Sequence, residues 1–187
     1  MNTQQDIAID PAARSVSDGP VATRGEAAWG RDADGIPKPP PVAPAQLAAW
    51  RAFLEAHART IDVLSRELRE AEDLPLTWYD VLVQLNEADE RRLRMQELAN
   101  AVLLSKSGLT RLIDRMERDG LVRREACPSD RRGTFAELTA AGHRRLREAA
   151  PAHLRGVNEH FAELFDEEEA ATLERLLRRV GAAHRQD

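Results

Sequence analysis

The feature that most constrains the fold is a helical run that ends at a glycine and leads directly into two strand-like runs. Residues 105–119 show the apolar spacing of an amphipathic helix, and Gly120 stands where a left-handed residue commonly ends a helix. Residues 121–126 and 134–138 then read as short strands, and the residues that join them include the proline, aspartate and glycine of a turn. A helix followed at once by a β-hairpin predicts a small antiparallel sheet.

The other periodic segments predict helices. Only 4% of the residues are aromatic while 32% are charged, a composition that favours amphipathic helices over large sheets. A heptad-like apolar series from Leu47 to Leu68, interrupted by His57, predicts a long first helix, and Thr77 is the expected cap of a second one. The predicted fold is mainly α, in the order α-α-α-α-β-β-α-α. Further helices are expected at 95–102, from Thr139 to about Leu164, and from Asp166 onward.

The two short helices at 95–102 and 105–119 have the features of a helix-turn-helix. Ala99 is small enough to let two helices cross closely, and Ser105 can cap the second helix. Hydrogen-bond donors remain exposed near the start of that helix, where they can reach base edges and phosphates in a DNA major groove. These donors are Lys106, Ser107, Thr110, Arg111 and Arg115.

The charge distribution favours contact with a polyanion. The chain has a net charge of −5, yet residues 91–147 contain fourteen Arg and Lys side chains against seven carboxylates. A basic segment on an acidic body is typical of a protein that presents one face to nucleic acid. The hairpin tip carries Arg131 and Arg132, which can enter the adjacent minor groove. Asp130 beside them is expected to support the turn or an arginine, because a carboxylate repels phosphate.

These segments resemble the MarR family of bacterial transcription regulators. The resemblance is carried by "SKSGLTRLIDRMERDG" from Ser105 to Gly120, by "PSDRRG" in the hairpin loop and by "LTAAG" from Leu138 to Gly142. It implies a winged helix-turn-helix and a two-fold dimer, built from the first and last helices, that binds a pseudo-palindromic operator. It places Ser105 with the donors above in the DNA-reading helix, with Lys106 as a base or backbone contact. In the wing it assigns Arg132 to the minor groove, with Arg131 as a further base or backbone contact.

The resemblance also divides the chain. Residues 1–44 contain ten charged residues, no Leu or Phe and a proline-rich end, so we expect a disordered or loosely docked arm. Residues 45–187 would form the MarR-type domain. Within it, residues 45–90 and 139–187 would supply dimerisation helices, and residues 91–139 the winged helix-turn-helix.

MarR proteins typically release DNA when a small aromatic or anionic ligand enters a pocket near the dimer helices. The candidates for such an effector pocket are His57, Trp78, Tyr79 and Asp80, although aromatic side chains at these positions more often fill a core. Asp80 together with Arg91 and Arg92 also loosely resembles the acidic and basic groups of the urate-sensing branch. That branch carries an N-terminal extension with a Trp, and the N-terminal arm of this chain likewise contains Trp29.

Several other classes of function find little support in the sequence. There is no phosphate-binding loop, nucleophile elbow or paired-carboxylate arrangement, so we expect neither an enzyme nor a cofactor. The single cysteine, Cys127, excludes an internal disulfide, and we expect no redox role for it. His153 and His160 can share a helix face but lack a third metal ligand. No run approaches the roughly 18 apolar residues of a membrane helix and no signal peptide is evident, so we expect a cytoplasmic protein.

The expected function is therefore sequence-specific binding of double-stranded DNA by a homodimeric regulator, a repressor that a small molecule releases from its operator. The alternative is a winged-helix module that docks onto a protein and binds no specific DNA. The sequence does not reveal the operator, the regulated genes or the effector.

Overall fold

The structure is a computed structural model that describes residues 33–36, 41–126 and 133–183. The chain divides into two compact units, one from Pro44 to Thr172 and one that combines residues 1–43 with residues 173–187. The helices are α1 (Pro44–Glu72), α2 (Leu76–Glu87), α3 (Met95–Ala101), α4 (Lys106–Arg118), α5 (Ala140–His160) and α6 (Glu167–Ala182). The strands are β1 (Arg92–Arg94), β2 (Val122–Ala126) and β3 (Thr134–Leu138). The 3-10 turns are η1 (Asp89–Arg91) and η2 (Ala162–Leu164).

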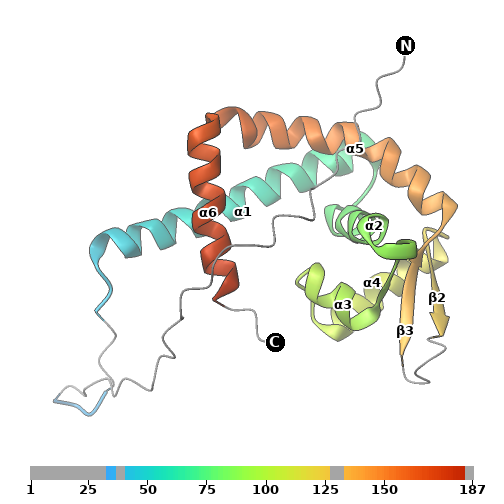
Figure 1. Ribbon diagram of the computed structural model, residues 1–187, viewed down its shortest axis with the longest axis horizontal. Coiled ribbons are helices and arrows are strands. Elements are labelled where there is room, and N and C mark those ends of the chain that lie inside the picture. The colour runs from blue at the N-terminus through green and yellow to red at the C-terminus, as the bar shows by residue number, and fades with distance from the viewer. Residues whose placement is uncertain (1–32, 37–40, 127–132, 184–187) are drawn as a thin grey trace. The chain divides into compact units, whose positions relative to one another are not determined.

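The predicted order of helices and hairpin strands is confirmed, and the structure adds one strand to it. In the larger unit α3 and α4 lie beside the β2–β3 hairpin, and α5 packs against α1 (Figure 1). The additional strand β1 pairs antiparallel with β3, so that the sheet has three strands in the order β1-β3-β2. It is only three residues long, too short for an alternating pattern to be recognised in the sequence.

Three helix starts test the predicted caps. The Ser105 hydroxyl accepts the Gly108 N–H at the start of α4, and the Thr139 hydroxyl accepts the Gly142 N–H at the start of α5, as predicted. The predicted cap at Thr77 is wrong. The cap position lies two residues earlier, at Pro75, so that helix α2 begins at Leu76 and no side chain caps it. The fixed φ of proline is compatible with this extended cap position.

The core of the larger unit joins the end of α1 to the segment from β1 to β3 (residues 92–138), which we call the reading head. It contains Leu64 and Leu68 from α1, and its apolar side chains continue through α2, α3, α4, the hairpin and α5. Helix α5 begins close to the sheet, because Gly142 lies against the backbone of Leu121 and a Cβ atom there would lie 2.1 Å from the Leu121 carbonyl oxygen. The "LTAAG" motif therefore has a packing reason: the threonine caps the helix and the glycine allows the close approach.

Helix α6 begins with a reciprocal cap. The Asp166 carboxylate accepts the Glu169 N–H at 2.9 Å, and the Glu169 carboxylate accepts the Asp166 N–H at 3.1 Å. This is the capping-box variant expected at this position. The apolar side chains Leu176, Leu177 and Val180 on α6 are exposed in the single chain.

Candidate nucleic-acid interface

Helix α4 has two sharply different faces. One face is buried in the core through Leu109, Leu112, Ile113 and Met116, so the rotation of the helix about its axis is set by packing. The opposite face is exposed and carries only polar and basic side chains at the sequence-predicted positions. These residues are Ser105, Lys106, Ser107, Thr110, Arg111 and Arg115.

The start of α4 is held by its own hydroxyl groups. The Ser105 Oγ lies 3.3 Å from the Ser107 Oγ while it accepts the Gly108 N–H at 3.1 Å. The Thr110 hydroxyl donates to the Lys106 carbonyl oxygen at 2.8 Å. The hydroxyl hydrogen of Thr110 is thus engaged within the helix, so this side chain would meet a DNA base as an acceptor or through its methyl group.

The two arginines on the exposed face of α4 lack protein partners in the part of the chain that the structure describes. Neither the Arg111 nor the Arg115 guanidinium makes an ion pair or hydrogen bond there, in contrast to Arg92, Arg123 and Arg124 of the neighbouring sheet. An arginine that is not neutralised by a carboxylate keeps all five of its N–H donors available for phosphate or base edges. The basic face of α4 is therefore suited to bind a polyanion.

A groove of about 350 Å³ adjoins this face, and it contains residues that the sequence analysis did not select. Arg94 and Gln96 line it from the start of α3, with Lys106 and Thr110 from α4. Arg94 also begins α3, where its backbone N–H donates to the Glu97 carboxylate at 3.0 Å. The first helix of a helix-turn-helix crosses the DNA backbone. The position of Arg94 and Gln96 at the start of that helix could therefore have identified them in the sequence.

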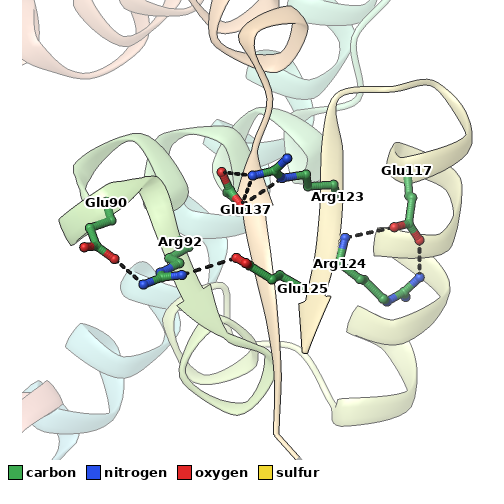
Figure 2. Close-up of polar contacts among 7 residues, drawn as sticks. All are labelled: Glu90, Arg92, Glu117, Arg123, Arg124, Glu125 and Glu137. Carbon is green, nitrogen blue, oxygen red and sulfur yellow. Dashed lines mark hydrogen bonds and ion pairs between the residues drawn. The ribbon is translucent and has the colours of Figure 1, made fainter. Parts of the chain in front are cut away.

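One face of the sheet carries a series of ion pairs across its strands (Figure 2). Arg123 on β2 donates to both carboxylate oxygens of Glu137 on β3 at 2.8 Å, and Arg92 on β1 bonds Glu125 on β2 at 3.2 Å and also Glu90. The hydrogen bonds from Arg123 lower the pKa of Glu137 below its ordinary value. The strands of the wing are thus joined by side chains as well as by the backbone.

The predicted wing tip lies outside the described residues. Asp130, Arg131 and Arg132, together with Cys127, belong to the segment 127–132. Their assignments to wing support and to DNA contact stay predictions, as do those made for the arm at residues 1–32. Strands β2 and β3, which precede and follow this segment, pair with each other from Val122–Leu138 to Ala126–Thr134.

The four candidates for an effector pocket have different surroundings. Tyr79 is buried, and its ring centroid lies 4.3 Å from that of His153 on α5. Trp78 is half-buried against the core, while Asp80 is exposed. His57 is exposed on α1, where its ring neighbour is Phe53. Trp78, Tyr79 and Asp80 are consecutive on α2, but no described contact joins them to His57, and Arg92 is bonded to Glu90 and Glu125 rather than to Asp80.

The buried pair at Tyr79 has shifted protonation equilibria. Burial raises the pKa of Tyr79 and lowers the pKa of His153. The Nδ1 atom of His153 is buried without a hydrogen-bond partner among the described residues. His160 pairs separately with Glu67 at 2.7 Å, and no group of three potential metal ligands occurs in the described part of the chain. In the same residues, no helix is both long and apolar enough to cross a membrane.

The known proteins that this chain resembles in sequence and those that it resembles in structure belong to the same family. Residues 72–133 match the family model described as MarR family. The curated HTH-type transcriptional regulator MhqR of Bacillus subtilis is 34% identical over 87 residues, which cover 46% of this chain and 59% of MhqR. The chain therefore spans about six-tenths of the length of that relative.

Two solved structures from Streptomyces coelicolor match most of the chain. Sco3205, a MarR family transcriptional regulator solved in complex with DNA, is 35% identical with a TM-score of 0.74, over 80% of this chain and 94% of that one. AbsC, also a MarR family transcriptional regulator, is 38% identical with a TM-score of 0.70, over 76% of this chain and 95% of that one.

Proposed function

The chain belongs to the MarR family, and from that premise we propose that it is a sequence-specific regulator of transcription that binds double-stranded DNA through α4 and the wing. The observation that carries the proposal is the exposed face of α4, where Arg111 and Arg115 have no partner in the described part of the chain while the opposite face is fully buried. The role is regulatory rather than enzymatic.

The test is binding of the full-length protein to a duplex that the protein itself selects from a random-sequence pool, with a scrambled duplex for comparison. Arg111→Ala should weaken binding to the selected duplex by about 1–3 kcal/mol if the side chain reads a base. Arg66→Ala is the matched control, because it removes another exposed arginine, on α1, whose ion pair with Asp62 at 3.6 Å is a surface contact. Equal affinity of both variants and the wild type would contradict the proposed role of α4.

We also propose that the protein acts as a two-fold homodimer on a pseudo-palindromic operator. The N-terminal two-thirds of α1 exposes a row of large apolar side chains, and α6 separately exposes another, which a monomer would leave in water. Light scattering should give the mass of a dimer, and the selected duplex should contain two inverted half-sites. The exposed side chains are Leu47, Trp50, Phe53, Leu54 and Ile61 on α1, and Leu176, Leu177 and Val180 on α6.

Finally, we propose that the protein is a repressor that a small aromatic or anionic molecule releases from DNA. Support comes from the α2–α5 contact, where the buried ring of Tyr79 lies beside the half-buried ring of His153, whose Nδ1 atom has no hydrogen-bond partner among the described residues. A ligand that binds the DNA-free form more tightly would lower operator affinity by mass action. A thermal-shift screen with salicylate-like aromatic acids tests this, since a binder raises the melting temperature.

A further inference from the structure

Arg124 on β2 holds the reading helix at four points, although it belongs to the wing. Its backbone N–H donates to the Glu117 Oε1 at 2.9 Å, and its guanidinium donates to the Glu117 Oε2 at 2.6 Å (Figure 2). The second terminal nitrogen lies 2.7 Å from the Asp114 Oδ1 and donates to the Thr110 carbonyl oxygen at 3.2 Å. We propose that Arg124 is a positioning residue, which fixes α4 relative to the wing and so determines operator affinity without contacting DNA.

The pleat of β2 explains why this arginine turns to the helix. Side chains alternate along a strand, so Arg124 shares a face with the buried Val122, while Arg123 and Glu125 lie on the opposite face with the cross-strand ion pairs. The side chain of Arg124 is accordingly 26% exposed, against 64% for Arg123. Packing of Val122 into the core thus brings the Arg124 guanidinium to the side of α4.

The three acceptors form a stripe along α4. Thr110, Asp114 and Glu117 follow one another at intervals of four and three residues, which places them on one side of the helix over two turns. Arg111 and Arg115 each directly follow a member of this stripe, so their direction is set by the same rotation of the helix about its axis. A planar guanidinium that bonds two turns at once resists both rotation and tilt.

The charge balance at this clamp argues against a DNA contact. Two carboxylates lie within 2.7 Å of the guanidinium nitrogens, so the positive charge of Arg124 is already compensated. Asp114 and Glu117 would otherwise stand beside the DNA-binding face as uncompensated negative charges. Arg124 therefore serves the interface by neutralising and orienting α4 rather than by attracting phosphate.

This inference rests on the proposed function, and its test uses the full-length protein with the duplex selected by the wild type. Arg124→Ala should weaken binding to that duplex by about tenfold, within the range for coupled side chains. The slope of log affinity against log salt concentration should stay unchanged, because no phosphate contact is lost. Arg123→Ala is the matched control. It removes the neighbouring arginine and its ion pair with Glu137, which lies on the other face of the strand.

Two further variants separate positioning from general destabilisation. Glu117→Gln should weaken binding in the same direction, and the double variant should lose less than the sum of the two single losses, because both act through one contact. Arg124→Lys keeps the charge but cannot bond two turns at once, so it should give an intermediate loss and serves if Arg124→Ala does not fold. Thermal unfolding of each variant without DNA shows whether the head stays folded.

Four outcomes would overturn the inference. The first is an operator affinity of Arg124→Ala or Arg124→Lys equal to that of the wild type, and the second is a loss of affinity in Arg124→Ala no greater than that in Arg123→Ala. The third is that the losses of affinity caused by Arg124→Ala and Glu117→Gln add up in the double variant. The fourth is a slope of log affinity against log salt concentration that Arg124→Ala reduces by about one, which would mark a phosphate contact. If the wild type selects no duplex, the proposed function fails instead. Hydrogen exchange of the DNA-free protein then decides, since Arg124→Ala must accelerate exchange of the α4 amides more than Arg123→Ala does.

Discussion

Gly142, in the first turn of α5, lies so close to Leu121 that a Cβ atom at position 142 would stand 2.1 Å from the Leu121 carbonyl oxygen. The same carbonyl accepts the hydroxyl of Thr139 at 2.9 Å, so the end of the head and the start of α5 meet at one backbone group. Replacing this glycine must move backbone, because the atom that the new Cβ would meet is not the end of a flexible side chain.

We therefore predict that Gly142→Ala destabilises the protein by about 1–3 kcal/mol, the usual cost of forcing extra atoms into a packed site. Urea denaturation followed by circular dichroism measures the change. Gly181→Ala in α6 is the control, since a Cβ atom there meets nothing within 4 Å and should leave stability equal or slightly higher. Equal stability of Gly142→Ala and the wild type would show that the helix start can shift freely.

The turn between α3 and α4 contains a strained leucine. Leu103 has a φ of 55° and is 91% exposed, so it bears the cost of a left-handed conformation without burying its side chain. We predict that Leu103→Gly raises the free energy of unfolding by up to about 1 kcal/mol, because relief of strain exceeds the added flexibility of the unfolded chain. Chemical denaturation tests this, and a loss of stability instead would assign the exposed side chain a contact.

Burial of His153 predicts a pH dependence of stability. Its pKa is lowered in the folded protein, so the unfolded chain binds more protons as the pH falls below the ordinary histidine value. The free energy of unfolding should thus decrease as the pH falls from about 7 to about 5, and His153→Phe should reduce that decrease while keeping a ring against Tyr79. Denaturation at a series of pH values measures it, with the exposed His57→Phe as control. An unchanged pH profile in His153→Phe would contradict the assignment.

A carboxylate of the wing predicts a second pH dependence of stability, which is caused by an ion pair rather than by burial and occurs at lower pH. The pKa of Glu137 is lowered by Arg123, so the stability that this carboxylate adds is present above its unfolded pKa and is lost as the pH falls through the folded one. Glu137→Gln should make unfolding less sensitive to acid below about pH 4.5. Glu174→Gln, which removes an exposed carboxylate paired with Arg178 on α6, should not. Identical acid profiles of the two variants would disprove the prediction.

The elements that could be predicted from sequence are those marked by long periodic patterns or by capping residues. Ser105, Thr139 and Gly120 each mark a helix end through their own local chemistry, and the apolar spacing of α4 identifies its exposed arginines. Strand β1 could not be predicted, because its three residues are in a strand only through pairing with β3, which lies more than forty residues later in the sequence.

The role of Arg124 was missed for a related reason. In the sequence it is one of two adjacent arginines, and nothing local distinguishes it from Arg123. Only the pleat of β2 separates them, placing one against α4 and the other on the outer face of the sheet. The wing tip and the effector remain predictions, whereas Thr77 was misassigned because Pro75 begins its helix without a side-chain cap.

The pairing of Arg92 on β1 with Glu137 on β3 brings the two ends of the reading head side by side. All of the residues proposed to contact DNA lie between those two positions in the sequence. We therefore expect this segment to be exchangeable for its counterpart from a related protein, provided that the side chains it shares with the core of α1, α2 and α5 are kept. Such an exchange would transfer the proposed choice of DNA target and leave the remaining helices as they are.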